Sequence, residues 1–269
     1  MPANASAARA FHDLHREGLL ILANAWDAGS ARLIESLGAR AIATTSCGVA
    51  WSHGYPDGDI LPADLAVATV ASIARTVRVP VTADIEGGYA DDPADVGGFA
   101  ARIVDAGAAG VNIEDGPASV DLTCRKIEAV RAAADQAGVA LFINARTDVY
   151  LRGLAPEGER VAETLARAAR YRDAGASGLF APGIVDPDEI RAVVLGAGLP
   201  LNVMARAGLP EAAGLEALGV RRLSSGGDLA EAVYGRLRDL ASAFLSSGDS
   251  EPLGHGAMSY PDLNALMSR

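Results

Sequence analysis

Two apolar runs in this sequence end in pairs of carboxylic acids. The run VPVTADIEG ends with Asp84 and Glu86, and the run AGVNIEDG ends with Glu114 and Asp115. Carboxylates that meet at the ends of neighbouring parallel strands repel one another unless a positive group lies among them. Oxygen ligands of this kind favour a hard divalent cation, Mg²⁺ above all, with Mn²⁺ as an alternative. The pattern therefore predicts metal-assisted chemistry on a small anionic substrate.

A basic residue follows a third apolar run, ALFINARTD. The alternation of side chains along a strand places Asn144 and Arg146 on one face, and gives Glu114 the inward direction in its own run. An arginine among acids at such a strand end is predicted to hold a substrate carboxylate. Structural pairing of Arg146 with Asp148 or Glu114 is the alternative. Asp115 is expected to cap the loop.

Other reactive residue types lie near these strand ends. Asp57, in the Gly/Pro-rich segment WSHGYPDGD, is expected either to cap a turn or to hold a metal-bound water. Tyr89, in the turn after Glu86, is a candidate proton-transfer group. Cys47 in TTSCG and Cys124 in TCRKIEAVR are more typical of packing residues than of nucleophiles, because no base is visibly paired with either.

The elements that must position these residues follow a regular order. Short apolar runs alternate with Ala-rich amphipathic helices, and eight runs are predicted as strands: 19–27, 40–48, 79–87, 109–116, 140–148, 177–184, 199–205 and 220–227. Parallel neighbours need helical crossovers, and eight such units close into a (β/α)8 TIM-type barrel whose active site lies at the strand C-termini. An open doubly wound sheet is the alternative. Against it, the first strand–helix turn lacks the G-x-G-x-x-G fingerprint.

Composition and charge limit the number of domains, the kinds of partner and the location that are expected for this chain. The 269 residues are half apolar, which is enough for one barrel domain over 1–269, with a C-terminal helical extension over 229–269. The net charge of −11 argues against a nucleic-acid partner, because no basic stripe could neutralise phosphates. No apolar run is long enough to span a membrane, and the N-terminus lacks a signal-peptide core. Two cysteines suit a reducing cytoplasm.

The sequence resembles the isocitrate lyase/phosphoenolpyruvate mutase superfamily in four segments that follow one order: NAWDAGSARLIESLGARAIATTSCGVAWSHGYPDGD, ADIEGGYADDP, GVNIEDG and INARTD. The resemblance covers nearly the whole chain. It implies a (β/α)8 barrel that exchanges its last helix between subunits of a homodimer or homotetramer. It also implies a Mg²⁺-dependent enzyme that binds a small 2-oxo or 2-hydroxy carboxylate and makes or breaks a C–C or C–P bond beside a carbonyl.

Position by position, the resemblance assigns roles to the candidate residues. It implies an acidic metal shell, reached partly through water, of Asp57, Asp84, Glu86 and Glu114. It implies a substrate site formed by Trp26, Ser46, Cys47, Gly48, Arg146 and Asn202. In the second set, the backbone N–H groups of residues 46–48 would hold the substrate carboxylate. The catalytic residues we predict are Asp57, Arg146 and Tyr89.

Two departures from the family pattern narrow the expected reaction. The acidic pair is Asp84-x-Glu86 where the family often has Asp-x-Asp, and the Lys-Lys-Cys-Gly-His loop of the lyases is absent from the region IEDGPASVDLTCRKIEAV. Cleavage of isocitrate or methylisocitrate is therefore not expected. The leading hypothesis is a carbon–carbon lyase acting on a carboxylate of the pyruvate, oxaloacetate or 2-oxoglutarate type, by cleavage or decarboxylation through a metal-stabilised enolate. The alternatives are a C–P mutase or hydrolase of the phosphonopyruvate type, and a non-catalytic Mg²⁺/2-oxo acid binding protein.

Overall fold

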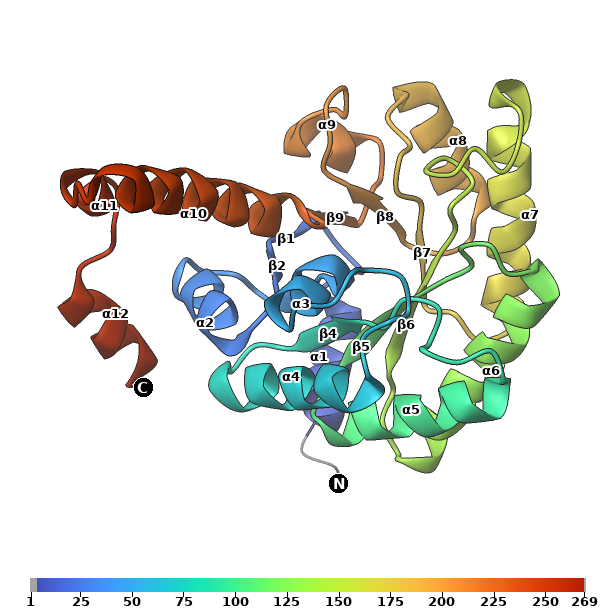
Figure 1. Ribbon diagram of the computed structural model, residues 1–269. Coiled ribbons are helices and arrows are strands. Elements are labelled where there is room, and N and C mark those ends of the chain that lie inside the picture. The colour runs from blue at the N-terminus through green and yellow to red at the C-terminus, as the bar shows by residue number, and fades with distance from the viewer. Residues whose placement is uncertain (1–3, 269) are drawn as a thin grey trace.

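A ring of parallel strands, surrounded by helices, forms the body of the protein (Figure 1). The computed structural model describes residues 4–268. The strands are β1 (Leu20–Leu22), β2 (Asn24–Ala25), β3 (Ile42–Thr44), β4 (Val81–Asp84), β5 (Gly110–Glu114), β6 (Phe142–Arg146), β7 (Gly178–Phe180), β8 (Leu201–Met204) and β9 (Arg222–Ser224). Each of the eight predicted runs contains a strand. The predicted (β/α)8 barrel is therefore confirmed.

The first predicted strand is divided in two, and this division closes the ring. The sheet order is β1-β9-β8-β7-β6-β5-β4-β3-β2. β1 pairs with β9, whereas β2, which begins two residues after β1 ends, pairs with β3. The two short strands thus join the first and last edges of the sheet. As a result the C-terminal ends of all strands face one rim.

Helices cover the outside of the ring and alternate with the strands. Their bounds are α1 (Ala5–Asp13), α2 (Ala28–Ser36), α3 (Ser46–Ser52), α4 (Ala63–Thr76), α5 (Pro93–Asp105), α6 (Val120–Gln136), α7 (Arg160–Asp173), α8 (Pro187–Gly196), α9 (Ala212–Ala217), α10 (Asp228–Ser247), α11 (Glu251–Gly254) and α12 (Tyr260–Met267). The repeated phrase D-A-G-A-x-G ends α5 and α7. Gly107 and Gly175 in it both have φ of 108°, a left-handed conformation that glycine adopts without strain.

The N-terminal end of the barrel is closed by α1. The rings of Phe11 and Phe142 meet in a T-shaped, edge-to-face arrangement with centroids 5.4 Å apart, and His15 stacks on Phe142 with centroids 4.0 Å apart. Gly110 makes room for this plug, because a Cβ there would lie 2.9 Å from Phe11 Cε1. Side chains from α1 and β6 therefore fill the barrel interior at its N-terminal end.

A layer of buried amides lies next to this plug, on the side towards the C-terminal ends of the strands. Asn144 Nδ2 donates to Asn112 Oδ1 at 2.9 Å and to Asn202 Oδ1 at 3.0 Å. Arg222 donates to the same Asn112 oxygen at 3.3 Å. Asn202, predicted to line the substrate pocket, lies in this interior layer and is 1% exposed.

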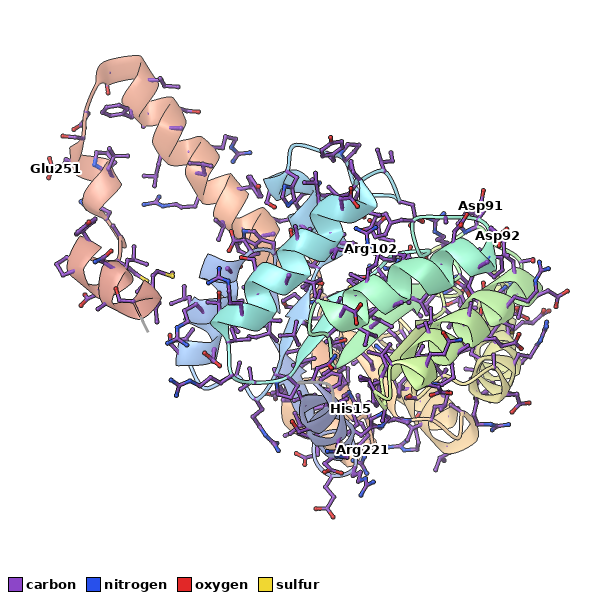
Figure 2. All side chains as sticks on the ribbon, turned by 90° about the horizontal axis from the view of Figure 1, so that it is seen from below. His15, Asp91, Asp92, Arg102, Arg221 and Glu251 are labelled. Atoms are coloured by element: carbon purple, nitrogen blue, oxygen red, sulfur yellow. The ribbon has the colours of Figure 1, made fainter. Side chains whose placement is uncertain are left out.

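The last three helices extend away from the barrel as an arm, with Glu251 at the turn farthest from it (Figures 1 and 2). α12 folds back beside α2, where Arg32 Nε donates to Leu266 O at 3.1 Å. Helices over the predicted extension are confirmed, and their exchange between subunits stays a prediction. Within residues 4–268, no helix has both the length and the apolar character to cross a membrane.

Candidate functional site

A cavity of about 340 Å³, here called the mouth cavity, opens at the C-terminal ends of the strands. Its lining residues are Asn24, Thr45, Ser46, Cys47, Trp51, Asp57, Asp84, Asn112, Arg146, Leu151, Phe180, Met204, Ser224, Gly226, Gly227, Asp228 and Glu231. Five predicted site residues are brought together here: Ser46, Cys47, Asp57, Asp84 and Arg146. The other six are not among its lining residues: Trp26, Gly48, Glu86, Tyr89, Glu114 and Asn202.

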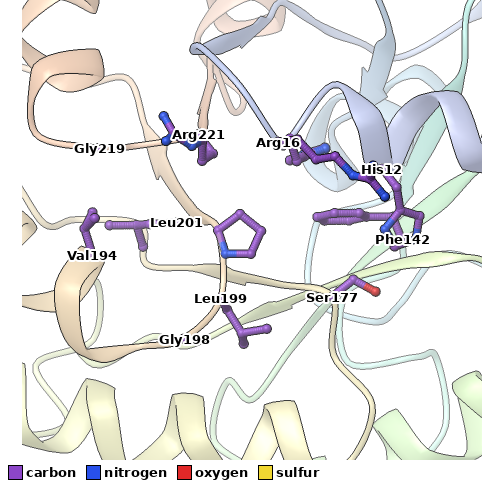
Figure 3. A pocket seen from close by; sticks show the side chains of 12 residues that line it. His12, Arg16, Phe142, Ser177, Val194, Gly198, Leu199, Leu201, Gly219 and Arg221 are labelled. Carbon is purple, nitrogen blue, oxygen red and sulfur yellow. The ribbon is translucent and has the colours of Figure 1, made fainter.

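A larger cavity, of about 510 Å³, lies at the opposite end of the barrel (Figure 3). Its lining includes His12, Arg16, Phe142 and Arg221. It adjoins the N-terminal ends of the strands, where residues of barrel enzymes support the fold and not the reaction. The mouth cavity is therefore the candidate active site despite its smaller volume.

Asp84 is the last residue of β4 and projects into the mouth cavity. Its backbone N–H donates to Thr44 Oγ1 at 2.8 Å, which fixes the strand end beside β3. Burial raises the pKa of the Asp84 carboxyl, and the nearby Arg146 guanidinium opposes that rise. Asp57 reaches the same cavity from the loop after α3. Two carboxylates from distant segments thus share one space.

Glu86 fastens the loop that carries Asp57. Its side chain is 3% exposed, and Oε2 accepts the backbone N–H of Gly58 at 2.9 Å and that of Asp59. Burial raises the pKa of Glu86 to about 7, against the stabilising effect of the Asp59 N–H. The other oxygen, Oε1, is buried and has no hydrogen-bond partner.

The same loop is fastened in the opposite direction by Asp59. Asp59 Oδ1 accepts the N–H of Gly87 at 3.1 Å and that of Tyr89 at 3.0 Å. Asp59, Glu86 and Tyr89 all have φ between 50° and 59°, the left-handed region that non-glycine residues seldom adopt. Such strain, in three residues of two adjoining loops, is typical of functional sites.

Arg146 forms ion pairs with both of its predicted structural partners. Its Nη1 lies 2.5 Å from Glu114 Oε2, and its Nε lies 2.7 Å from Asp148 Oδ1. Burial alone would lower the pKa of Arg146, but these two carboxylates outweigh it and the net shift is upward. Arg146 also lines the mouth cavity beside the Phe180 ring. It is thus held by acids while remaining open to a ligand.

The charged groups around Glu114 include more acids than bases. Burial raises its pKa to about 8, Arg146 opposes the rise, and Asp84, Asp148 and Glu86 add to it. Its neighbour Asp115, which was expected to cap the loop, does not line the cavity. The Asp115 carboxylate accepts hydrogen bonds from Asp148 N, Arg167 and Tyr171.

The segment TTSCG forms the first turn of α3. Gly48 is required there, because a Cβ would lie 2.8 Å from Thr45 Cγ2 and 2.9 Å from Trp26 Cβ. Trp26 therefore packs behind α3 and lines a neighbouring groove in place of the mouth cavity. Burial raises the pKa of the Cys47 thiol, so the thiol is protonated at neutral pH and suits packing better than nucleophilic attack.

Several residues of the site were not predicted from the sequence. Leu151 and Trp51 supply apolar walls from loops and α3, and Asp228 and Glu231 add acids from α10. Lys126 Nζ donates to Gly87 O at 2.7 Å and anchors the acidic turn from α6. The sequence around Lys126 predicts a helix and does not indicate that contact.

The donor set fits Mg²⁺ bound largely through water. In the part of the chain that the structure describes, no three His, Cys, Asp or Glu side chains already converge as a metal site. Mg²⁺, however, commonly keeps several waters and uses one or two carboxylates plus substrate oxygens. Asp57 and Asp84, which both line the mouth cavity, meet that requirement.

Comparisons with known proteins agree with this arrangement. The phosphoenolpyruvate phosphomutase family model matches residues 11–245. An uncharacterized protein of Mycobacterium tuberculosis is 40% identical over 222 residues, which cover 80% of this chain and 81% of that protein.

Two solved structures show the same barrel. A Burkholderia cenocepacia protein provisionally described as a phosphonomutase is 41% identical, with a TM-score of 0.83 over 88% of this chain and 99% of that one. A 2,3-dimethylmalate lyase, described as a member of the PEP mutase/isocitrate lyase superfamily, is 26% identical, with a TM-score of 0.85 over 99% and 95%. The likeness therefore extends through the C-terminal arm.

Proposed function

The chain belongs to the phosphoenolpyruvate phosphomutase family, within the PEP mutase/isocitrate lyase superfamily of lyases and mutases. From this premise we propose that it is a Mg²⁺-dependent enzyme that cleaves a C–C bond in a small 2-oxo or 2-hydroxy carboxylate. The observation that carries the proposal is the meeting of Asp57, Asp84 and Arg146 in one cavity. These residues supply two metal ligands and one carboxylate-binding cation.

Each residue at the rim has a part in this proposal. A Mg²⁺ ion would supply Lewis acidity, polarising the substrate carbonyl and stabilising the charge that bond cleavage leaves on its oxygen. Asp57 and Asp84 would hold the ion, and Glu86 keeps the Asp57 loop in place. Arg146 would bind the substrate carboxylate, together with the first backbone N–H groups of α3 at Ser46 and Cys47.

The site offers few candidate proton-transfer groups, which favours a reaction that needs little acid–base assistance. The connection from β5 to α6 consists of residues 115–119, too short for the lyase loop with its catalytic cysteine. Burial raises the pKa of Tyr89, and the neighbouring Glu86 charge adds to the rise. Tyr89 stays a predicted proton-transfer group. Decarboxylation, or a cleavage whose product takes its proton from water, suits this site best.

C–P bond chemistry is the second candidate, because one relative is described as a phosphonomutase. A phosphonate carries more negative charge than a carboxylate and needs more cations. Among the described residues that line the cavity, Arg146 is the one cation, whereas Asp228 and Glu231 add negative charge. The charge balance therefore favours C–C over C–P cleavage.

We also propose that the arm joins subunits in a homodimer or homotetramer. α10 exposes apolar side chains along its length: Val233, Tyr234, Leu237, Phe244 and Leu245. Several large apolar side chains exposed on one helix are typical of an interface. The free cysteines Cys47 and Cys124 support the cytoplasm as the proposed location.

The proposed reaction is tested by product analysis. Purified protein is incubated with Mg²⁺ and either oxaloacetate, 2,3-dimethylmalate or phosphonopyruvate, and products are followed by NMR, with the Asp84→Ala variant as control. We expect Mg²⁺-dependent loss of oxaloacetate or 2,3-dimethylmalate. Conversion of phosphonopyruvate alone would support the second candidate, and thermal stabilisation without turnover would indicate a binding protein. Absence of any Mg²⁺ effect would refute all three.

A further inference from the structure

Arg222 is a charged side chain enclosed in the barrel interior. It is the largest of the fully buried side chains in the described structure, with 0% exposure. Its Nη2 donates to Asn112 Oδ1 at 3.3 Å, whereas Nε and Nη1 have no hydrogen-bond partner. Within residues 4–268 it forms no ion pair. An unpaired buried charge is costly, so its retention calls for a reason.

The position of Arg222 follows from strand alternation. Arg221, one residue earlier, lines the cavity at the N-terminal end of the barrel (Figure 3). Arg222 faces the opposite way, into the amide layer between the His15–Phe142 plug and the mouth cavity. Burial lowers the pKa of Arg222 to about 9, so its guanidinium is charged at neutral pH.

A carboxylate lies beside this layer, on the neighbouring strand β4. Asn112, which accepts from Arg222, is the register partner of Asp84 in the β4–β5 pair. Asp84 is the carboxylate whose charge favours the protonated form of Arg222. On the other side, His15 is uncharged, since burial and the Arg222 charge lower its pKa to about 3. Asp84 is therefore the carboxylate whose charge opposes the effect of burial on Arg222.

The rim of the cavity has too few cations for its acids. The carboxylates Asp84, Glu114 and Asp148 share the Arg146 guanidinium, and Arg152 reaches only Asp148. Before a metal ion binds, Arg146 offsets the acidic charge from the rim, and Arg222 adds a second positive charge from the barrel interior. Once a divalent cation binds, the same positive charge repels it.

We propose that Arg222 is a positioning residue, an internal counter-charge that holds Asp84 in the metal-free barrel and weakens the binding of a divalent cation above it. This inference rests on the proposed metal site. The direction in which metal affinity changes when Arg222 is replaced distinguishes this role from a purely structural one. Loss of a structural contact would weaken metal binding, whereas loss of an opposing charge strengthens it.

The test is calorimetric titration of Mg²⁺ and Mn²⁺ at pH 8 into wild type, Arg222→Met and Arg222→Lys. Methionine removes the charge at similar length, and lysine keeps it. We expect Arg222→Met to bind either ion about tenfold more tightly, and Arg222→Lys to stay within twofold of wild type. Arg131→Met is the matched control, because Arg131 is a partly buried arginine that bonds Leu141 O and Gly175 O far from the rim.

The outcomes separate this inference from the metal site itself. A wild type that binds neither ion overturns the proposed metal site, and with it the basis of the inference. A wild type that binds them, together with a folded Arg222→Met of unchanged or weaker affinity, overturns the role of Arg222 alone. Should Arg222→Met fail to fold without metal, the double variant Asp84→Asn/Arg222→Met must regain the fold, because it removes both charges. Failure of the double variant also counts against the proposal.

Discussion

Glu86 and Asp59 hold each other's loops. The Glu86 carboxylate accepts the backbone N–H of Asp59, and the Asp59 carboxylate accepts the N–H of Gly87, the residue after Glu86. Asp57 lies two residues before Asp59 and so takes its place at the mouth cavity from this reciprocal contact. Glu86, which was predicted as a metal ligand, thus supports in the described structure the loop that carries another predicted ligand, Asp57.

Replacement of Glu86 by alanine should loosen the Asp57 loop. Groups that orient metal ligands commonly contribute 10- to 100-fold to metal affinity, so Glu86→Ala is expected to weaken Mg²⁺ binding by about that factor. Isothermal titration calorimetry measures the effect. Asp64→Ala, which removes an exposed pair with Arg102, is the control and should leave affinity unchanged. Equal affinities of Glu86→Ala and wild type would disprove the supporting role.

Asp84→Asn should separate metal binding from folding. An asparagine keeps the size of the Asp84 side chain but removes the negative charge that a metal ion needs. The metal-free variant is expected to remain folded and to lose the rise in Tm that Mg²⁺ produces. Differential scanning fluorimetry with and without Mg²⁺ measures both. A rise in Tm with Mg²⁺ equal to that of the wild type would refute Asp84 as a metal ligand.

The stability of the metal-free protein should fall as the pH rises from about 5 to 8. Glu86 and Glu114 have folded-state pKa values raised to about 7 and about 8, above the ordinary value of 4.5. The folded state then binds more protons than the unfolded state across this window, so unfolding free energy decreases with pH. Urea unfolding at pH 5.5, 7 and 8.5 measures the slope.

Metal binding should release protons in the same pH window. Titrations of Mg²⁺ at pH 7 in two buffers of different ionisation enthalpy are expected to show a net release, because the ion competes with protons on these carboxyls. A stability that increases with pH, or identical heats in both buffers, would contradict the raised pKa values.

Asp115→Ala should destabilise the barrel by about 3–5 kcal/mol, because it leaves Arg167 and Tyr171 without their buried acceptor. It also frees the N–H of Asp148, which holds Arg146, so KM for the substrate should rise. Urea unfolding and steady-state kinetics measure the two effects. Asp121→Ala, which removes an exposed pair with Arg170, is the control and should leave the free energy of unfolding nearly unchanged. A loss in Asp115→Ala no larger than that of the control would contradict the anchoring role.

Leu237→Glu and Phe244→Glu on α10 should disrupt the proposed assembly. Both side chains are exposed in the single chain, and a charge there would be buried at an interface. Analytical ultracentrifugation should show smaller particles than the wild type. Leu195→Glu, an exposed apolar residue on α8, is the matched control and should leave the mass unchanged. A monomeric wild type would disprove the assembly itself.

The order of strands and the acids at their ends could be predicted from local patterns. The alternation of apolar runs with helical segments identified all eight strand positions, and Asp84, Arg146 and Asp57 reach one cavity because the C-termini of parallel strands share a rim. The break between β1 and β2 could not be predicted in this way. It depends on pairing with β9 and β3, which lie at distant positions in the sequence.

What each carboxylate and cation contacts was decided only by the tertiary structure. The left-handed backbone at Glu86 turns its side chain towards the 57–59 loop, and Lys126 reaches the same turn from α6. The sequence by itself determined the barrel and the acidic rim, because strand periodicity and parallel topology are local and regular. It did not determine the partners of Arg146 or the enclosure of Arg222, because those depend on which side chains from distant strands meet inside a closed ring.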